Sequence, residues 1–236
     1  MKEEIIIYII LKHNKNYLRN ERGEKKMANT FEKPYRFTDT EKDRAFFTVP
    51  AEELALWLLG KVICHQLPGE KDPIRFRINV VEAYGKDDPF CHAVKYTDKK
   101  RKGATTQLEI GGTLYTHGRN CFDIVADEKG IAGGVLIRGA KNINGDPDEN
   151  YYYEGKGKPK KLSFALNIEP LMNGVDFLNK DEELWIEDDG FDPADKYLTG
   201  ERINLNIPNG IDESEKEKYE VYIKKPLRFF LKPSEI

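Results

Sequence analysis

The segment Ile74-Arg75-Phe76-Arg77-Ile78-Asn79-Val80-Val81-Glu82-Ala83-Tyr84 decides the fold. Its apolar side chains recur at every second position, at Ile74, Phe76, Ile78 and Val80. This is the period of a β-strand that buries one face. Continuing the alternation places Glu82 and Tyr84 on that same buried side. The segment therefore predicts a long strand that carries a carboxylate toward the interior.

The flanking sequence predicts further strands and few helices. Pro50 and the acidic pair Glu52-Glu53 suit the first turn of a helix that Gly60 ends. A strand is expected over residues 61–67, and a helix over residues 160–166. Other strands are expected over residues 113–117, 122–126, 135–138, 184–187, 203–207 and 227–231. Because helices are too few for a doubly wound parallel sheet, we expect one α+β domain with a mixed, mainly antiparallel sheet flanked by helices.

The composition is that of a globular protein with a highly charged surface. Of 236 residues, 39% are hydrophobic and 33% are charged, which excludes a disordered tail or a fibrous repeat. The longest apolar run, residues 5–11, is far shorter than the roughly 20 residues that cross a bilayer, so no membrane partner is expected. Cys64, Cys91 and Cys121 show no disulfide spacing, which fits a reducing cytoplasm.

Residues 1–26 differ in character from the rest of the chain. Residues 21–26, Glu-Arg-Gly-Glu-Lys-Lys, are what a purine-rich ribosome-binding sequence would encode if it were translated. Natural synthesis is therefore expected to start at Met27, and the alternative is a genuine N-terminal strand. The expected organisation is an extension over residues 1–26 and a functional domain over residues 27–236.

Glu82 is the first candidate for chemistry. A carboxylate on an apolar strand face loses its hydration unless it is paired, protonated or placed in a wet cleft. Tyr84 and His92 follow closely, so an aromatic ring, a carboxylate and an imidazole can converge on one cleft. The alternative is that the strand ends at Val81 and Glu82 points to solvent.

A metal site is not expected. The possible soft ligands are Cys64-His65, Cys91-His92 and the pair His117 and Cys121. Adjacent residues on a strand face opposite ways, and the chain has no Cys-x-x-Cys. Small buried cysteines and scattered histidines explain these residues better than zinc does.

Positive charge is clustered although the formal net charge is −3. The basic runs are Lys95, Lys99, Lys100, Arg101 and Lys102, then Lys156, Lys158, Lys160 and Lys161, and finally Lys224, Lys225 and Arg228. Acidic residues gather over residues 181–195 and 212–220. Such segregation suits a surface that faces phosphates and a back that repels them, although an ordinary solvated face remains the alternative for any single run.

Short segments in a fixed order carry a family resemblance. They are Phe46-Phe47, Leu58-Leu59-Gly60-Lys61, Val81-Glu82-Ala83-Tyr84, Asp87-Asp88-Pro89, His92, Gly112-Thr113-Leu114-Tyr115, Val135-Leu136-Ile137-Arg138, Gly157, Lys161-Leu162, Ala165-Leu166-Asn167-Ile168 and Lys225-Pro226-Leu227-Arg228-Phe229. Together they resemble the alkyladenine (3-methyladenine) DNA glycosylases over about residues 44–231. The resemblance implies a single domain with a curved antiparallel sheet.

The resemblance also implies a function in base excision repair. A monofunctional DNA glycosylase flips an alkylated purine, above all 3-methyladenine, from duplex DNA and hydrolyses the N-glycosidic bond, which leaves an abasic site. The implied partner is double-stranded DNA with damaged purines, bound by a monomer without a cofactor or metal. The implied location is the cytoplasm, at the nucleoid in a prokaryote.

Site residues follow from the same resemblance. Glu82 resembles the family's water-activating carboxylate, and Arg138 resembles an arginine close to the catalytic water and the lesion phosphate. The expected substrate-binding residues are Tyr84, His92, Tyr115, His117 and Asp123. The basic residues expected to contact DNA are Lys99, Lys100, Arg101, Arg119, Lys156 and Lys158.

Departures from the family pattern bear on the range of substrates. The chain is shorter than the pattern between Tyr115 and Ile124 and has no counterpart of the tyrosine that wedges into the duplex. Asp123 stands at the position of a pocket asparagine, and an ionised carboxylate cannot donate hydrogen bonds. One alternative is therefore a noncatalytic protein of the same fold that binds damaged DNA or another nucleic acid. Another is an unrelated small-molecule hydrolase that uses Glu82 and His92 and has no affinity for DNA.

Overall fold

The computed structural model describes residues 34–96, 103–117, 121–145 and 162–235. It also describes the backbone of three short strands, β1 (Tyr17–Arg19), β2 (Lys25–Met27) and β9 (Asn150–Tyr152). The chain divides into two compact units, residues 1–34 and residues 35–236. In the first unit, β1 and β2 form an antiparallel pair. The second unit contains all the other elements.

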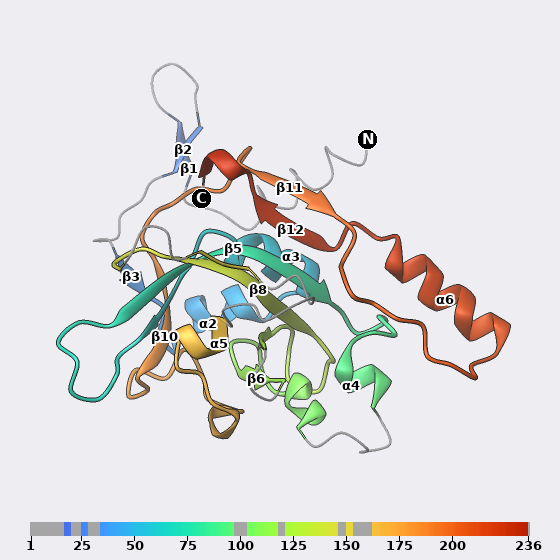
Figure 1. Ribbon diagram of the computed structural model, residues 1–236. Coiled ribbons are helices and arrows are strands. Elements are labelled where there is room, and N and C mark those ends of the chain that lie inside the picture. Colours follow the sequence, from blue (N-terminus) through green and yellow to red (C-terminus); the bar gives the residue numbers. More distant parts are fainter. Residues whose placement is uncertain are drawn as a thin grey trace. The chain divides into compact units, whose positions relative to one another are not determined.

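The second unit is built on a long antiparallel pair, β5 (Ile74–Tyr84) and β8 (Gly134–Asn142) (Figure 1). The other strands are β3 (Tyr35–Arg36), β4 (Val62–His65), β6 (Leu114–Thr116), β7 (Phe122–Val125), β10 (Leu184–Asp188), β11 (Tyr197–Gly200) and β12 (Arg228–Leu231). The sheet has the order β3-β10-β4-β5-β8-β7-β6, and β12 continues the β4 edge along the second half of β5. All the strand pairs of the described residues are antiparallel.

Short helices flank this sheet, which confirms the expected α+β class. They are α2 (Glu41–Phe47), α3 (Ala51–Leu58), α4 (His92–Lys95), α5 (Leu162–Ala165) and α6 (Glu213–Ile223), with 3-10 turns η1 (Ala104–Leu108), η2 (Pro170–Met172) and η3 (Pro233–Glu235). As predicted, α3 begins after Pro50 with two acidic residues, and it buries Leu54 and Leu58. Within the described part of the chain, no helix is both long enough and apolar enough to span a membrane.

The side chains of β5 that face the main core switch from one face of the strand to the other in mid-strand. Phe76 and Ile78 belong to the main core, and so do Val81 and Ala83, so the spacing between core residues is three at this point instead of two. The register against β8 shifts there: Ile78 pairs with Ala140, Val80 with Gly139 and Val81 with Ile137. This leaves Asn79 of β5 and Arg138 of β8 outside the one-to-one pairing, as in a β-bulge.

The shift corrects the predicted face of Glu82 and Tyr84. Both side chains are buried, as expected, but they lie on the opposite face from Phe76 and Ile78. A one-residue irregularity exchanges the two faces of every residue that follows it. The strand also continues to Tyr84, which excludes the alternative in which Glu82 points to solvent.

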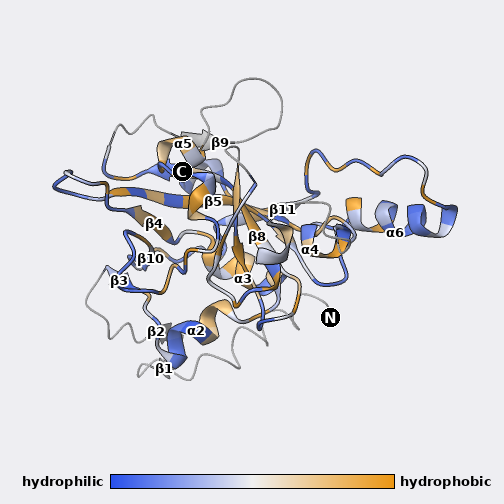
Figure 2. Ribbon diagram, turned by 90° about the horizontal axis from the view of Figure 1, so that it is seen from below, coloured by the Kyte–Doolittle hydropathy of each residue, from blue (hydrophilic) through white to orange (hydrophobic). Residues whose placement is uncertain are grey.

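A second, smaller core forms on that opposite face. Tyr84 and Leu136 of the sheet pack there with Phe90 and Cys91, under side chains of α4 and α6. In Figure 2 the apolar colour is concentrated on β8 and α3, whereas the outer part of α6 is hydrophilic. The small core fixes the end of β5 where the candidate site lies.

Residues 203–207, predicted to be a strand, are irregular in the structure. They belong to the connection between β11 and β12, which also contains α6. The N–H of Ile203 donates to a side chain of β5 rather than to a neighbouring strand. The alternating apolar residues therefore reflect packing of this connection, with Leu205 against the small core.

Candidate active site

Glu82 lies at the centre of the candidate site and is completely buried, with 0% of its surface exposed. Its Oε2 accepts hydrogen bonds from the Tyr84 hydroxyl and from Arg138, both at 2.8 Å. Its Oε1 accepts the backbone N–H of Ile203 at 3.0 Å. These donors compensate the desolvation of the carboxylate, which otherwise would make its burial very costly.

Arg138 supplies the countercharge from the irregular position of β8. One guanidinium nitrogen binds Glu82 and lies 3.5 Å from the carbonyl oxygen of Ile203. Burial by itself lowers the pKa of an arginine, but the charge of Glu82 outweighs burial and raises the pKa of Arg138 above its ordinary value. The pair is therefore a fixed ion pair in which the arginine stays charged.

Tyr84 is held on two sides. Its hydroxyl binds Glu82, and the guanidinium of Arg202 lies over its ring, 4.3 Å from the ring centroid. Burial, and next the charge of Glu82, keep the pKa of the Tyr84 hydroxyl well above its ordinary value. The hydroxyl is therefore a permanent hydrogen-bond donor to the carboxylate.

An aromatic cluster forms the other part of the site. The His92 Nδ1 lies 2.9 Å from the Tyr115 hydroxyl. The ring of His117 lies 4.6 Å from both the His92 ring and the Tyr115 ring, centroid to centroid. His92 opens α4, whereas Tyr115 and His117 come from β6 and the residue after it. Tyr115 is only 1% exposed, whereas His92 and His117 are partly exposed, so the ring surface that could stack with a nucleobase belongs to the two histidines in this structure.

His117 forms an ion pair with Asp123, whose Oδ1 lies 2.8 Å from the His117 Nε2. Burial lowers the pKa of an imidazole, but the charge of Asp123 outweighs it and raises the pKa of His117 to about 10. His117 is therefore an imidazolium at neutral pH, and its charge is balanced by the carboxylate.

Gln107 holds the Asp123 carboxylate from the side opposite His117. Its amide nitrogen donates to the Asp123 Oδ2 at 2.6 Å, and its amide oxygen accepts the backbone N–H of Ala93 at 3.0 Å. Gln107 and Asp123 are both buried. The polar chain from His117 to α4 is thus continuous and lies inside the fold.

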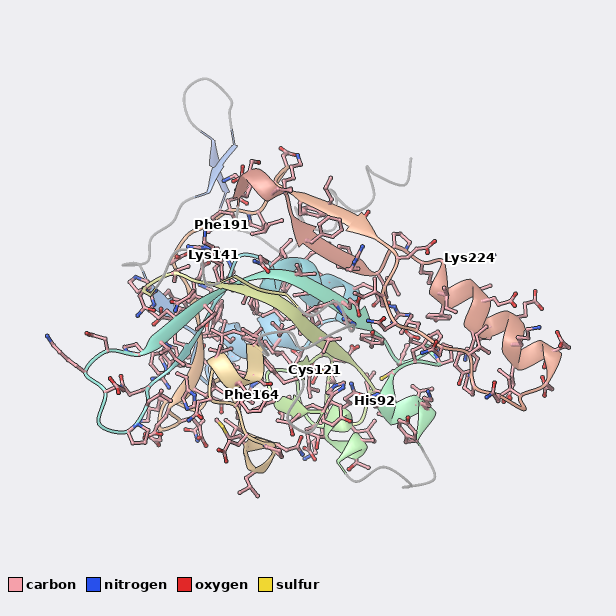
Figure 3. All side chains as sticks on the ribbon, viewed as in Figure 1. His92, Cys121, Lys141, Phe164, Phe191 and Lys224 are labelled. Carbon is pink, nitrogen blue, oxygen red and sulfur yellow. The ribbon has the colours of Figure 1, made fainter. Side chains whose placement is uncertain are left out.

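The sheet register brings the two parts of the site together. Tyr115 pairs with Asp123, Asp123 with Leu136, and Leu136 with Glu82, one residue from each of four neighbouring strands. At roughly 4.8 Å between strands, the backbones of Tyr115 and Glu82 are about 14 Å apart. In Figure 3, His92 and Cys121 lie at one end of the β5–β8 pair and Lys141 at the other. All five of the predicted substrate-binding residues therefore lie around one end of the sheet, with Glu82 and Arg138.

Other predicted residues are not placed, and some site residues were missed. The six basic residues expected to contact DNA lie outside the described residues: Lys99, Lys100, Arg101, Arg119, Lys156 and Lys158. Sequence reasoning missed Gln107, Arg202 and Ile203. The only signal is that Ile203 opens the segment predicted to be a strand, residues 203–207, and that Arg202 immediately precedes it. Within residues 34–96, 103–117, 121–145 and 162–235, no group of three or more His, Cys, Asp or Glu side chains could hold a metal ion.

Comparison with known proteins gives one consistent family. The family model described as "Methylpurine-DNA glycosylase (MPG)" matches residues 45–235. A protein of Alkaliphilus oremlandii named "Putative 3-methyladenine DNA glycosylase" is 32% identical over 183 residues, which cover 70% of this chain and 87% of the relative. A Clostridium perfringens protein of the same name is 30% identical, with 69% and 87% covered. A protein of Encephalitozoon cuniculi, "Probable DNA-3-methyladenine glycosylase", is 29% identical, with 75% and 86% covered.

Proposed function

Because the chain belongs to the methylpurine-DNA glycosylase family, we propose that it is a monofunctional DNA glycosylase that removes alkylated purines, foremost 3-methyladenine, from duplex DNA. The damaged nucleotide is flipped out of the helix, its N-glycosidic bond is hydrolysed, and an abasic site is left. The observation that carries the proposal is the buried Glu82 carboxylate, held by Tyr84, Arg138 and Ile203.

Glu82 has two tasks in this reaction. It accepts a proton from the attacking water, and its charge stabilises the positive charge that develops on the deoxyribose as the bond to the base breaks. The three fixed donors hold the carboxylate in one orientation, so little reorganisation is needed during the reaction. The Ile203 carbonyl oxygen, close to Arg138, offers a second acceptor for the water beside the carboxylate.

One carboxylate is enough for an alkylated base. Alkylation at a ring nitrogen makes the purine cationic and a good leaving group, so no second acid has to protonate it. Hydrolysis of a glycoside differs, because its alcohol leaving group requires a general acid. The proposed reaction needs neither a metal nor an organic cofactor.

Tyr84 and the aromatic cluster of His92, Tyr115 and His117 are proposed to hold the flipped base. Tyr84, His92, Tyr115 and His117 supply ring faces and edges, and such pockets read the flipped base by stacking and hydrogen bonds. Asp123 balances the charge of His117, so the pair adds no net positive charge that would repel a cationic purine. This arrangement is compatible with the cationic substrate that we propose.

The DNA backbone is proposed to contact the basic residues Lys99, Lys100, Arg101, Arg119, Lys156 and Lys158. We propose that one monomer binds one lesion in double-stranded DNA, at the nucleoid if the cell is a prokaryote. Phosphate contacts of this kind provide affinity without sequence preference.

The test is to incubate the protein with methylated duplex DNA and to measure the released bases. We expect release of 3-methyladenine by the parent protein and none by Glu82→Gln, which keeps the side-chain shape but removes the charge. Binding of Glu82→Gln to lesion-containing DNA should stay within about tenfold of the parent, because binding and chemistry are separate steps. Tight binding without release by the parent would favour the noncatalytic alternative, and full turnover by Glu82→Gln would refute the role of the carboxylate.

A further inference from the structure

Arg202 is a completely buried arginine that the proposed reaction does not use. Its side chain is 0% exposed, and it forms an ion pair with Asp88, which is itself buried. The same nitrogen donates to the backbone carbonyl of Ala83 at 2.8 Å, and the other terminal nitrogen lies 3.3 Å from the carbonyl oxygen of Tyr222. Arg202 thus joins the end of β5, the loop before α4, and α6.

The guanidinium also touches the candidate active site directly. It lies over the ring of Tyr84, whose hydroxyl binds Glu82. The next residue in the chain, Ile203, gives its N–H to the same carboxylate. Two of the three donors to Glu82 therefore adjoin Arg202, Tyr84 through a ring contact and Ile203 as the next residue of the backbone.

The sheet contains a comparable arginine that is remote from these donors. Arg77 forms an ion pair with Asp189 at 2.6 Å, donates to the carbonyl of Gly60 at 2.9 Å and lies 4.7 Å from the centroid of the Phe191 ring. Its side chain is 20% exposed. Both arginines combine an ion pair, a backbone carbonyl and an aromatic ring, but only the ring beneath Arg202 contacts Glu82. Arg77 is therefore a matched control for the structural part of the role.

From this geometry we infer that Arg202 is a positioning residue for base excision, which orients Tyr84 and Ile203 against the Glu82 carboxylate. The inference rests on the proposed glycosylase function. Arginine suits the task because a planar guanidinium stacks on a ring while its N–H groups bind a carboxylate and carbonyls, which a lysine cannot do at once. A displacement of about 1 Å in a catalytic group is enough to lower a rate about a hundredfold.

The inference predicts a specific effect on the chemical step. In Arg202→Met, the single-turnover rate of 3-methyladenine release at saturating enzyme should fall about tenfold to a hundredfold. The dissociation constant for undamaged duplex DNA should change less than about twofold. In Arg202→Lys, which keeps the charge beside Asp88, the rate should be intermediate. In Arg77→Met, the rate of the folded protein should equal that of the parent.

A double variant separates positioning from a general loss of structure. If Arg202 acts through Tyr84, the combined loss of rate in Arg202→Met with Tyr84→Phe should be smaller than the product of the two single losses, because interacting residues are not additive. Independent structural effects would multiply instead. Thermal unfolding of each variant shows which proteins are folded at the assay temperature.

The possible results have distinct meanings. If the parent releases no base, the proposed function itself is overturned. If the parent is active and a folded Arg202→Met or Arg202→Lys releases base at the parental rate, the positioning role is overturned. Multiplicative losses in the double variant overturn it as well. Should Arg202→Met fail to fold, an intermediate rate in Arg202→Lys supports the role.

Discussion

The ion pair of His117 with Asp123 leads us to predict how the stability of the folded protein depends on pH. The pKa of His117 is about 10 in the folded protein, against an ordinary value of 6.5. Because the folded-state pKa is raised, the imidazolium stabilises the fold fully below pH 6.5, and this stabilisation is lost as the pH rises toward 10. Replacing Asp123 by asparagine removes the charge that raises the pKa, so most of this dependence should disappear.

The size of the loss in stability follows from the raised pKa of His117. Each pKa unit corresponds to about 1.4 kcal/mol, so between pH 7.5 and 9.5 the contribution of His117 should fall by about 2–3 kcal/mol in the parent. In Asp123→Asn the same interval should change this contribution by less than about 1 kcal/mol, because His117 is then largely neutral at both pH values. The Cys121 thiol also contacts His117, so both proteins should carry Cys121→Ser.

The assay is urea unfolding at the two pH values, together with an NMR titration of the His117 ring proton. Asp189→Asn, which breaks an ion pair with Arg77 and involves no histidine, is the matched control and should keep the parental pH dependence. A His117 titration midpoint near 6.5 in the parent would refute the reasoning. An equal loss of stability in the parent and Asp123→Asn would refute it too.

Three further predictions concern DNA binding, substrate range and the buried network. Neutralising Lys99, Lys100 and Arg101 should flatten the fall of DNA affinity with added salt, since each lost phosphate contact reduces counterion release, and an unchanged slope would place the DNA surface elsewhere. Because the chain has no wedge tyrosine, single-turnover assays should show hypoxanthine and ethenoadenine released at least about tenfold more slowly than 3-methyladenine, which corresponds to about 1.4 kcal/mol or more of lost transition-state stabilisation. Comparable rates would show that another residue fills the space that the flipped base leaves in the stack. Gln107→Leu should lower the free energy of unfolding by about 2–4 kcal/mol, because it leaves Asp123 and the Ala93 N–H without this partner, whereas Gln66→Leu, which loses backbone contacts at an exposed turn, should cost less than about 1 kcal/mol.

Local pattern predicted the central strand, the helix after Pro50 and most of the sheet, because these elements follow regular apolar periods. It failed where the backbone departs from regularity. After Asn79 the strand has apolar residues on both faces, Val80 on one and Val81 and Ala83 on the other, so alternation alone does not decide at which residue the two faces exchange. The helix α6 was missed because its first two turns are almost entirely polar and none of its residues is fully buried, so its apolar contacts with the small core come only from Tyr219, Tyr222 and Ile223 near its end.

The candidate site was predictable where family resemblance reached it and hidden where long-range contacts build it. Glu82, Tyr84 and Arg138 were expected at one site, and Tyr84 and Arg138 both bind Glu82 in the structure. Arg202 was not expected, because its role depends on Asp88, which is 114 residues away in the sequence. The partnership of Asp123 with Gln107 was equally hidden, since an amide in a polar stretch has no distinctive pattern.

The hydrogen bond from Ile203 to Glu82 joins residues that are 121 positions apart, and this has a consequence for the newly made protein. At 5–20 residues per second, a ribosome needs roughly 6–24 s to pass from the first residue to the second. During that time the carboxylate lacks its third donor, and Arg202 has not yet reached Tyr84. The nascent chain can thus bury its first strands long before its candidate active site is complete, since that site requires residues 202 and 203 of the 236.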